Sequence, residues 1–156
     1  MELTVRFVDT SVLCNLLDVP GRNQHRDEIR AEFEALVREG STRFVIPVTT
    51  VIETGNHIAN ADGDRRAAAE RLDRLLAQAA RDDAPWQLHA VTWDARFLDA
   101  LRAGASTGST MVDHLGNATM GTGDLAILCE RDEFLRRSSF RSAEVWTLEA
   151  TMAAYS

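Results

Sequence analysis

Short strand-like segments alternate with longer helix-like segments along this 156-residue chain, and this alternation limits the fold more than any other feature. The strand-like segments are rich in β-branched and aromatic residues. They span residues 4–8, 43–47, 86–91, 110–112 and 143–148. The helix-like segments repeat apolar residues every three or four positions. They span residues 10–18, 24–40, 48–60, 64–81, 93–104 and 123–137, and the last residues form a helical tail. Alternating β and α elements predict one domain, residues 1–156, built as a three-layer α/β/α sandwich around a mostly parallel sheet.

An acidic residue follows the first predicted strand, where Asp9 stands before Thr10 and Ser11. In an open α/β sheet, ligands bind beyond the carboxyl ends of the strands, so an acid at this position is a candidate site residue. Asp, Thr and Ser are also common at helix starts, so Asp9 alone does not decide between these interpretations. The decision depends on further acids at matching places.

Three further acids stand at comparable places. Glu53 lies in the predicted helix after the second strand, and Asp124 opens a late apolar helix. Glu149 follows the last predicted strand, two residues after Thr147. Each has a simple explanation by itself: a helical Glu is usually solvated, and an acid in the first turn of a helix is favoured by the helix dipole. The four positions together are more specific than any one of them.

The net charge of −7 argues against a protein that coats nucleic acid, because such proteins carry a strong basic excess. It does not exclude nucleic acid as a substrate, since clustered acids can bind metal ions that engage phosphate. Two groups of arginines, within residues 65–74 and 131–141, could form a local basic surface. For the first group a solvated helix face is the better interpretation, because Glu70 and Arg74 have the spacing of an i,i+4 ion pair.

The two cysteines, Cys14 and Cys129, stand in apolar segments without CxxC spacing, so we expect reduced thiols in the core. The sequence has no apolar run near the ~20 residues of a membrane span, and no signal-peptide pattern. These features predict a cytoplasmic protein without a membrane partner.

From "FVDTSVL" through "VIPVTTVIETGNHIA" and "GTGDLAIL" to "VWTLE", the chain resembles the PIN-domain nucleases, including the VapC-like toxins of bacterial toxin–antitoxin pairs. In that family the first strand ends in Asp followed by Ser or Thr, as Asp9 and Ser11 do here. A second acid follows in the helix after the second strand, and a third opens a late apolar helix; Glu53 and Asp124 match these positions. The fourth acid often belongs to a T-x-D pattern, whereas this chain has Glu149 in place of Asp.

The resemblance implies a divalent-metal-dependent ribonuclease that uses Mg²⁺ or Mn²⁺, with Asp9, Glu53 and Asp124 as catalytic metal ligands. It also implies roles for three neighbouring residues: Glu149 as a further metal ligand, and Ser11 and Thr147 as hydrogen-bonding partners of the ligands. RNA is the implied substrate. An antitoxin protein and a second copy of the chain, as a homodimer, are the implied partners.

The chemistry of phosphodiester hydrolysis explains why acids suit such a site. The reaction needs an in-line water and stabilisation of negative charge on the phosphate and the leaving oxygen. Hard divalent cations with oxygen ligands provide both, and in two-metal sites the ions lie ~3.5–4 Å apart. Carboxylates that gather in one place repel one another, so we expect a raised pKa for at least one of them. Whether one ion or two would bind stays open, as does the role of Glu149.

Other functions remain as alternatives. Haloacid-dehalogenase-like phosphatases also place an Asp after the first strand, but in a D-x-D pattern, and the residue two positions beyond Asp9 is Ser11. Response-regulator receivers need a late Lys, which this sequence lacks. A PIN-like domain that binds a partner without catalysis is a further alternative, and the presence of all three acids argues against it. Of the nearby polar residues, His57 and Asp113 are left outside the catalytic set.

Overall fold

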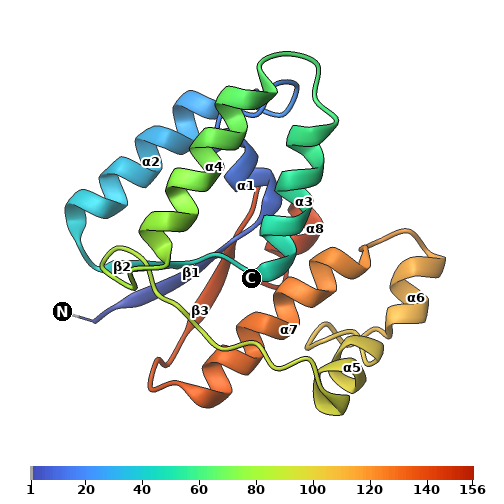
Figure 1. Cartoon of the computed structure of the whole chain (residues 1–156). Helices are drawn as coiled ribbons and strands as arrows, with labels where there is room; N and C mark the ends of the chain where they lie inside the picture. The colour runs from blue at the N-terminus through green and yellow to red at the C-terminus, as the bar shows by residue number, and fades with distance from the viewer. Residues whose placement is uncertain (1) are drawn as a thin grey trace.

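Three parallel strands form the central sheet of the computed structural model, which describes residues 2–156. The strands are β1 (Thr4–Val8), β2 (Thr42–Val45) and β3 (Ala143–Trp146), in the order β2-β1-β3. The register places Phe7 of β1 beside Val45 on one side and Val145 on the other. Strand β1 is therefore the centre of the sheet, with a neighbour on each side (Figure 1).

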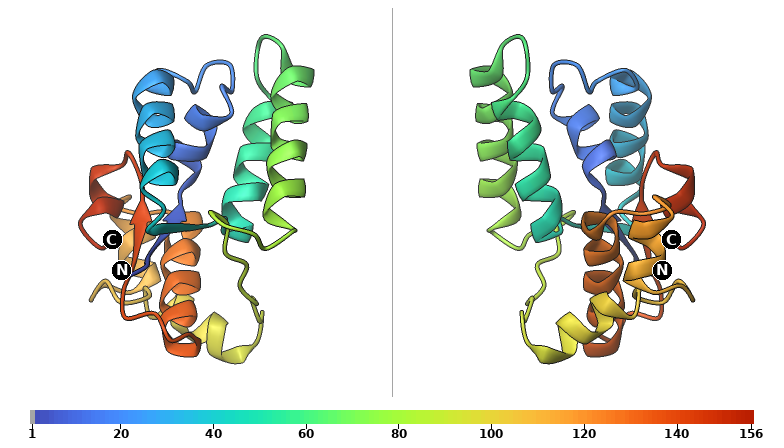
Figure 2. Two further views of the ribbon diagram at one scale, coloured as in Figure 1. Left: turned by 90° about the vertical axis from the view of Figure 1, so that its left-hand side faces the viewer. Right: turned by 90° about the vertical axis from the view of Figure 1, so that its right-hand side faces the viewer.

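Eight helices alternate with these strands in the described part of the chain. One group is α1 (Thr10–Leu16), α2 (Arg26–Glu39), α3 (Val48–Ala59) and α4 (Arg65–Ala79). The other group is α5 (Ala95–Arg102), α6 (Met111–Gly116) and α7 (Thr122–Arg137), and the short α8 (Ala150–Ala153) follows β3. The two groups lie on opposite sides of the sheet (Figure 2). The predicted three-layer α/β/α architecture with a parallel sheet is confirmed.

Side chains that alternate along β1 build one hydrophobic core on each face of the sheet. Val5 and Phe7 pack with Leu125 of α7 in the first core. Val8 packs with Leu13 of α1 in the second core. All five side chains are buried, so α1 and α7 are fixed on opposite sides of β1. This packing sets where the polar residues at the start of each helix lie.

Residues 86–91, predicted as a strand, make only a single bridge to the sheet. Phe44 of β2 and Trp86 pair in parallel, and two backbone hydrogen bonds of 2.8 and 2.9 Å flank the pair. The chain then leaves the sheet edge, because His89 packs edge-on against Phe7 on the α7 side, with 5.4 Å between the ring centroids. The strand prediction is wrong beyond this bridge, since tertiary packing outweighs the local β propensity.

The predicted strand at residues 110–112 is also wrong, because these residues open α6. The hydroxyl of Thr110 accepts a hydrogen bond from the backbone N–H of Asp113 at 3.1 Å, which is the geometry of a helix N-cap. A run of three residues carries too little periodicity to separate a strand from the first turn of a helix.

Two arginines from the predicted basic groups hold the fold together instead of facing solvent. Arg71 donates to the carbonyl oxygens of Leu17 and Asp18 at 2.6 and 3.1 Å. Arg131 is buried and donates to the carbonyl oxygen of Tyr155 at 3.0 Å. The interpretation of residues 65–74 as a solvated face is therefore wrong for Arg71, which faces a loop of the same chain.

The cysteines match their prediction. Cys14 and Cys129 are free and buried, and burial raises the pKa of each thiol to about 11, so neither is a thiolate at neutral pH. No helix within residues 2–156 has both the length and the apolar character that crossing a bilayer requires.

Candidate active site

The carboxyl ends of the three strands meet at one edge of the sheet, and the candidate site lies there. The order β2-β1-β3 means that the chain crosses from one side of β1 to the other, and ligands favour such a switch point. Asp9 follows β1, and its backbone N–H donates to the carbonyl of Trp146 at 3.0 Å, which joins the ends of β1 and β3. The hydroxyl of Thr50 donates to the carbonyl of Val8 at 2.8 Å, which fixes the start of α3 against the end of β1.

Asp9 is held as a buried, oriented carboxylate. Its side chain is among the least exposed of the polar residues, and its Oδ2 accepts hydrogen bonds from Ser11 Oγ at 2.8 Å and from Thr147 Oγ1 at 2.7 Å. Ser11 Oγ in turn accepts the backbone N–H of Leu148 at 3.0 Å. The two hydroxyls thus occupy one oxygen of Asp9 and leave Oδ1 for the pocket. The sequence prediction that Ser11 and Thr147 support the acid is consistent with this geometry.

Glu53 reaches the same place from α3. Its Oε1 accepts a hydrogen bond from Thr10 Oγ1 at 2.9 Å, so each residue of the Thr-Ser pair after Asp9 orients a different carboxylate. The first turn of α7 approaches Glu53 at Gly123. A Cβ atom at Gly123 would lie 2.9 Å from Glu53 Oε2, closer than real contacts allow. Glycine at this position therefore lets α7 begin beside the carboxylate.

Asp124 and Glu149 form a second pair of acids with different surroundings. Burial raises the pKa of Asp124 to about 7, and the negative charges of Glu149, Asp9 and Glu53 add to the effect. Burial also raises the pKa of Glu149, again with contributions from Asp9 and Glu53. Beyond the effect of burial, part of each shift is the mutual repulsion that clustering predicts, because each acid is harder to ionise beside the charges of the others.

One pocket of about 250 Å³ is lined by all four acids, Asp9, Glu53, Asp124 and Glu149. The sequence alone predicted the set, and the fold brings it together from β1, α3, α7 and the end of β3. The predicted set also includes Ser11 and Thr147, and both contact Asp9.

The donor set fits a hard divalent cation. Carboxylate oxygens are the ligands that Mg²⁺ and Mn²⁺ prefer, and Mg²⁺ keeps several waters when one or two carboxylates bind it. Within residues 2–156, no group of three or more His, Cys, Asp or Glu side chains is arranged to hold an ion directly. The four acids instead stand around a pocket with room for waters and a phosphate, which suits an ion bound by few carboxylates. Asp9, with one oxygen left by the two hydroxyls, and Asp124, which forms no ion pair within residues 2–156, are the best-placed residues to hold such an ion.

Two polar residues near the predicted site have different positions. His57 lines the pocket, and burial lowers the pKa of its imidazole, with a further lowering by Arg22. The ring is therefore neutral near pH 7 and could accept a proton. Asp113 lies in the first turn of α6 and is not among the residues that line the pocket, in agreement with its exclusion from the site.

Sequence reasoning missed the loop between α1 and α2. This loop brings Arg22, Gln24 and His25 to the mouth of the acidic pocket. The only signal in the sequence was the turn at Pro20 and Gly21, which ends the helical pattern but does not tell where the following side chains point.

The chain matches no family model, no curated protein and no solved structure. The resemblance to the PIN-domain nucleases therefore stays a prediction from sequence motifs, and the function rests on the geometry of the site.

Proposed function

We propose that this protein is a divalent-metal-dependent ribonuclease of the PIN-like type, which hydrolyses RNA phosphodiester bonds. The observation that carries the proposal is the convergence of Asp9, Glu53 and Asp124, with Glu149, in one pocket at the switch point of a parallel sheet. If these acids were only helix caps or solvated residues, there would be no reason for four of them from separate segments to converge on one pocket. Burial, together with repulsion among the acids, raises the pKa of Asp124 and Glu149, and a bound cation would stabilise their ionised forms.

The residues have distinct proposed roles. Asp9 is the central ligand, because Ser11 and Thr147 fix one of its oxygens and leave the other free. Glu53, oriented by Thr10, and Asp124 complete the ligand set, and Glu149 lies at the rim. When bound, Mg²⁺ or Mn²⁺ would neutralise charge on the phosphate and lower the pKa of an attacking water. The protein's own contribution is to gather the acids around one pocket and to orient Asp9 and Glu53 with hydroxyl groups before the substrate arrives.

The alternative of a haloacid-dehalogenase-like phosphatase loses support at Ser11. That chemistry needs a second carboxylate two residues beyond the nucleophilic Asp, whereas the Ser11 hydroxyl donates to Asp9 itself. A partner-binding module without catalysis has no need for four acids around a pocket of this size. No observation within residues 2–156 favours either alternative.

The wider biology of the proposal follows from the sequence resemblance. It comprises a toxin role that an antitoxin protein inhibits, and a homodimer of the chain. The two free, buried thiols suit a reducing compartment, so the proposed place of action is the cytoplasm.

Incubation of the purified protein with labelled single-stranded and structured RNAs, with and without Mn²⁺, tests the activity. We expect cleavage that needs the metal and falls at least ~10³-fold in Asp9→Asn, which corresponds to ~4 kcal/mol of transition-state stabilisation. Asp113→Asn is the matched control, because it removes an acid outside the pocket and should leave the rate unchanged. Cleavage that persists at the parent rate in Asp9→Asn would refute the proposed site.

A further inference from the structure

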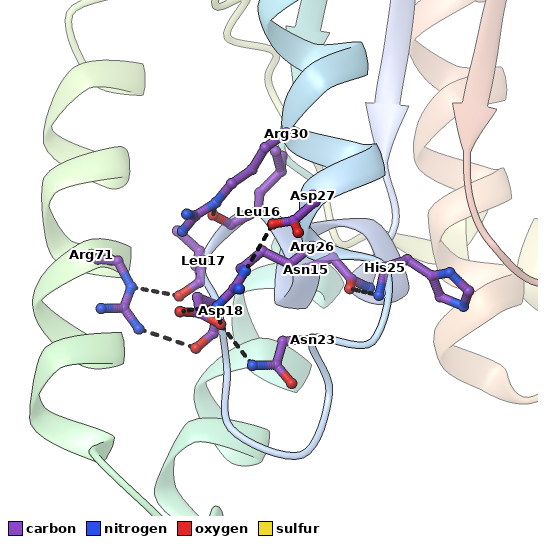
Figure 3. A network of polar contacts seen from close by, with 10 residues as sticks. All are labelled: Asn15, Leu16, Leu17, Asp18, Asn23, His25, Arg26, Asp27, Arg30 and Arg71. Carbon is purple, nitrogen blue, oxygen red and sulfur yellow. Dashed lines mark hydrogen bonds and ion pairs between the residues drawn. The ribbon is translucent and has the colours of Figure 1, made fainter.

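The loop of residues 17–25, between α1 and α2, forms part of the pocket wall and is anchored from two helices (Figure 3). Arg71 of α4 donates to two successive backbone carbonyls of the loop at 2.6 and 3.1 Å. From α1, the Asn15 side chain accepts the backbone N–H of His25 at 2.8 Å. Both ends of the loop are therefore bound to the helices beside it.

Asp18 provides a second set of bonds inside the loop. Its backbone has a φ of +53°, a left-handed conformation that is uncommon for non-glycine residues but that Asp tolerates in turns. Its carboxylate accepts a hydrogen bond from Asn23 at 2.6 Å and from Arg26 at 3.1 Å to each oxygen. These bonds connect the start of the loop to its end, so the residues between them have a defined position.

Arg22 is the exception among the arginines of this region. Arg26, Arg30 and Arg71 all bond to residues 16–18 and hold the loop in place. Arg22 lies at the tip of the loop, lines the acidic pocket and is exposed. Within residues 2–156 its side chain takes part in no hydrogen bond or ion pair; only its backbone N–H is bonded, to Val19.

This separation of charges is informative because Arg22 shares a pocket with four carboxylates. A guanidinium on an unrestrained loop would pair with such acids, as charge-assisted bonds are among the strongest in proteins. In the anchored loop Arg22 instead lines the same pocket as the acids without forming an ion pair to any of them within residues 2–156. A ligand that complements both parts has a cation for the acids and an anionic group for Arg22. A nucleic acid strand with a bound metal ion has this pattern. The metal ion on one phosphate would face the acids, and a neighbouring phosphate of the backbone would face Arg22.

We propose that Arg22 binds a backbone phosphate of the RNA strand adjacent to the phosphate that is cleaved, so that the loop of residues 17–25 sets the path of the substrate into the pocket. This inference rests on the proposed ribonuclease function. Arg22 would contribute to substrate binding more than to the chemical step, because it is exposed on the loop, whereas the acids would engage the reacting phosphate through the cation that they bind.

Binding of a labelled single-stranded RNA, measured by fluorescence anisotropy in an Asp9→Asn background that blocks cleavage, tests Arg22 directly. Arg22→Gln should weaken binding roughly tenfold. It should also reduce the slope of log Kd against log salt concentration by roughly 0.7, the value for one phosphate contact on a single strand. Arg22→Lys should have an affinity between that of the parent and that of Arg22→Gln, since it keeps the charge and loses the planar donor fork.

Arg38→Gln is the matched control. Arg38 is also exposed, but it lies in the last turn of α2, ~20 Å along the helix from the loop. Arg38→Gln should leave the RNA affinity and the salt slope unchanged. Arg22→Gln should keep the parent melting temperature, because the side chain has no intramolecular partner to lose. In the otherwise unmodified enzyme, Arg22→Gln should raise KM with kcat nearly unchanged.

The outcomes separate this inference from the proposed function. Metal-dependent cleavage with unchanged KM, Kd and salt slope in Arg22→Gln would overturn the role of Arg22 and leave the ribonuclease intact. RNA binding that depends on Arg22 without any cleavage would support the phosphate contact and overturn the activity. Absence of both binding and cleavage would overturn both.

Discussion

The two pairs of acids in the pocket differ in how the protein holds them. Asp9 and Glu53 accept hydrogen bonds from neighbouring hydroxyls at 2.7 to 2.9 Å. Asp124 and Glu149 receive no such hydroxyl bond within residues 2–156, and burial together with the other acids raises the pKa of both. The first pair is oriented by the fold before any ligand arrives. The second pair is held in place by the backbone of α7 and of the end of β3, while its charge state depends on what occupies the pocket.

This difference separates two contributions to a metal site. Oriented carboxylates give the site its geometry, because their oxygens cannot turn away from the pocket. Carboxylates with raised pKa values give the site its response to pH and to metal, because a proton and a cation compete for them. Substitutions in the two pairs should therefore fail in different ways.

The largest effect within the second pair is expected for Asp124→Asn. Activity should fall roughly 10²-fold or more, equal to ~2.7 kcal/mol of transition-state stabilisation, because an amide ligates a hard cation poorly. The melting temperature without metal should hold or rise above pH 7, since one of four repelling charges is gone. The thermal shift on adding Mn²⁺ should flatten.

The competing explanation for Asp124 is a favourable interaction with the dipole of α7. That explanation predicts lower stability without metal and near-normal cleavage for Asp124→Asn. Differential scanning fluorimetry with and without Mn²⁺, together with the RNA cleavage rate, distinguishes the two results.

A smaller and continuous effect is expected from pH. The folded protein keeps a proton on Asp124 up to about pH 7, while the unfolded chain loses it near the ordinary value of 3.8. Between these values the native state binds more protons, so this group's contribution to stability is full below about pH 4 and is lost as pH rises through about 7.

Metal binding should follow the opposite trend, because the cation must displace that proton. The apparent Mn²⁺ affinity, taken from the thermal shift, should fall by up to roughly tenfold per pH unit below 7. Asp124→Asn should weaken both trends, and the raised pKa of Glu149 should account for what remains of them. A Mn²⁺ shift of equal size at pH 8 and pH 5.5 in the parent protein would count against Asp124 as a ligand.

The smallest effect is expected when one hydroxyl of the oriented pair is removed. Thr147→Val keeps the shape of the side chain but loses one of the two bonds to Asp9 Oδ2, while Ser11 keeps the other. It also removes the acceptor of the Glu149 backbone N–H, which lies 3.0 Å from the Thr147 hydroxyl. Activity should fall about tenfold, within the range for groups that orient a metal ligand. In contrast to Asp124→Asn, the pH dependence of the Mn²⁺ shift should stay as in the parent. A changed pH profile in Thr147→Val would show that loss of the bond to the Glu149 backbone alters the second pair as well.

Local pattern was enough to predict most of the fold. All three strands and all the helices of at least seven residues within residues 2–156 were predicted from local sequence patterns. Buried residues follow these patterns because each element packs one face against a core. Residues 86–91 have the same local pattern as a strand, yet they leave the sheet after one bridge. Their path depends on His89 meeting Phe7, a contact between residues 82 positions apart. No local pattern contains such a contact.

The sequence by itself, through its resemblance to the PIN-domain pattern, predicted which acids would gather: Asp9 after the first strand, Glu53 inside the helix that follows the second strand, and Asp124 in the first turn of a late helix. Only the tertiary structure decided how those acids differ. The hydrogen bond from Thr147 to Asp9 spans 138 positions of the chain, and the pKa of Asp124 depends on burial and on charges brought from three other elements. The position of Arg22 likewise required the bonds from α1 and α4 to its loop. Residue types and strand ends are local properties, whereas burial, repulsion and loop position arise only when distant segments pack together.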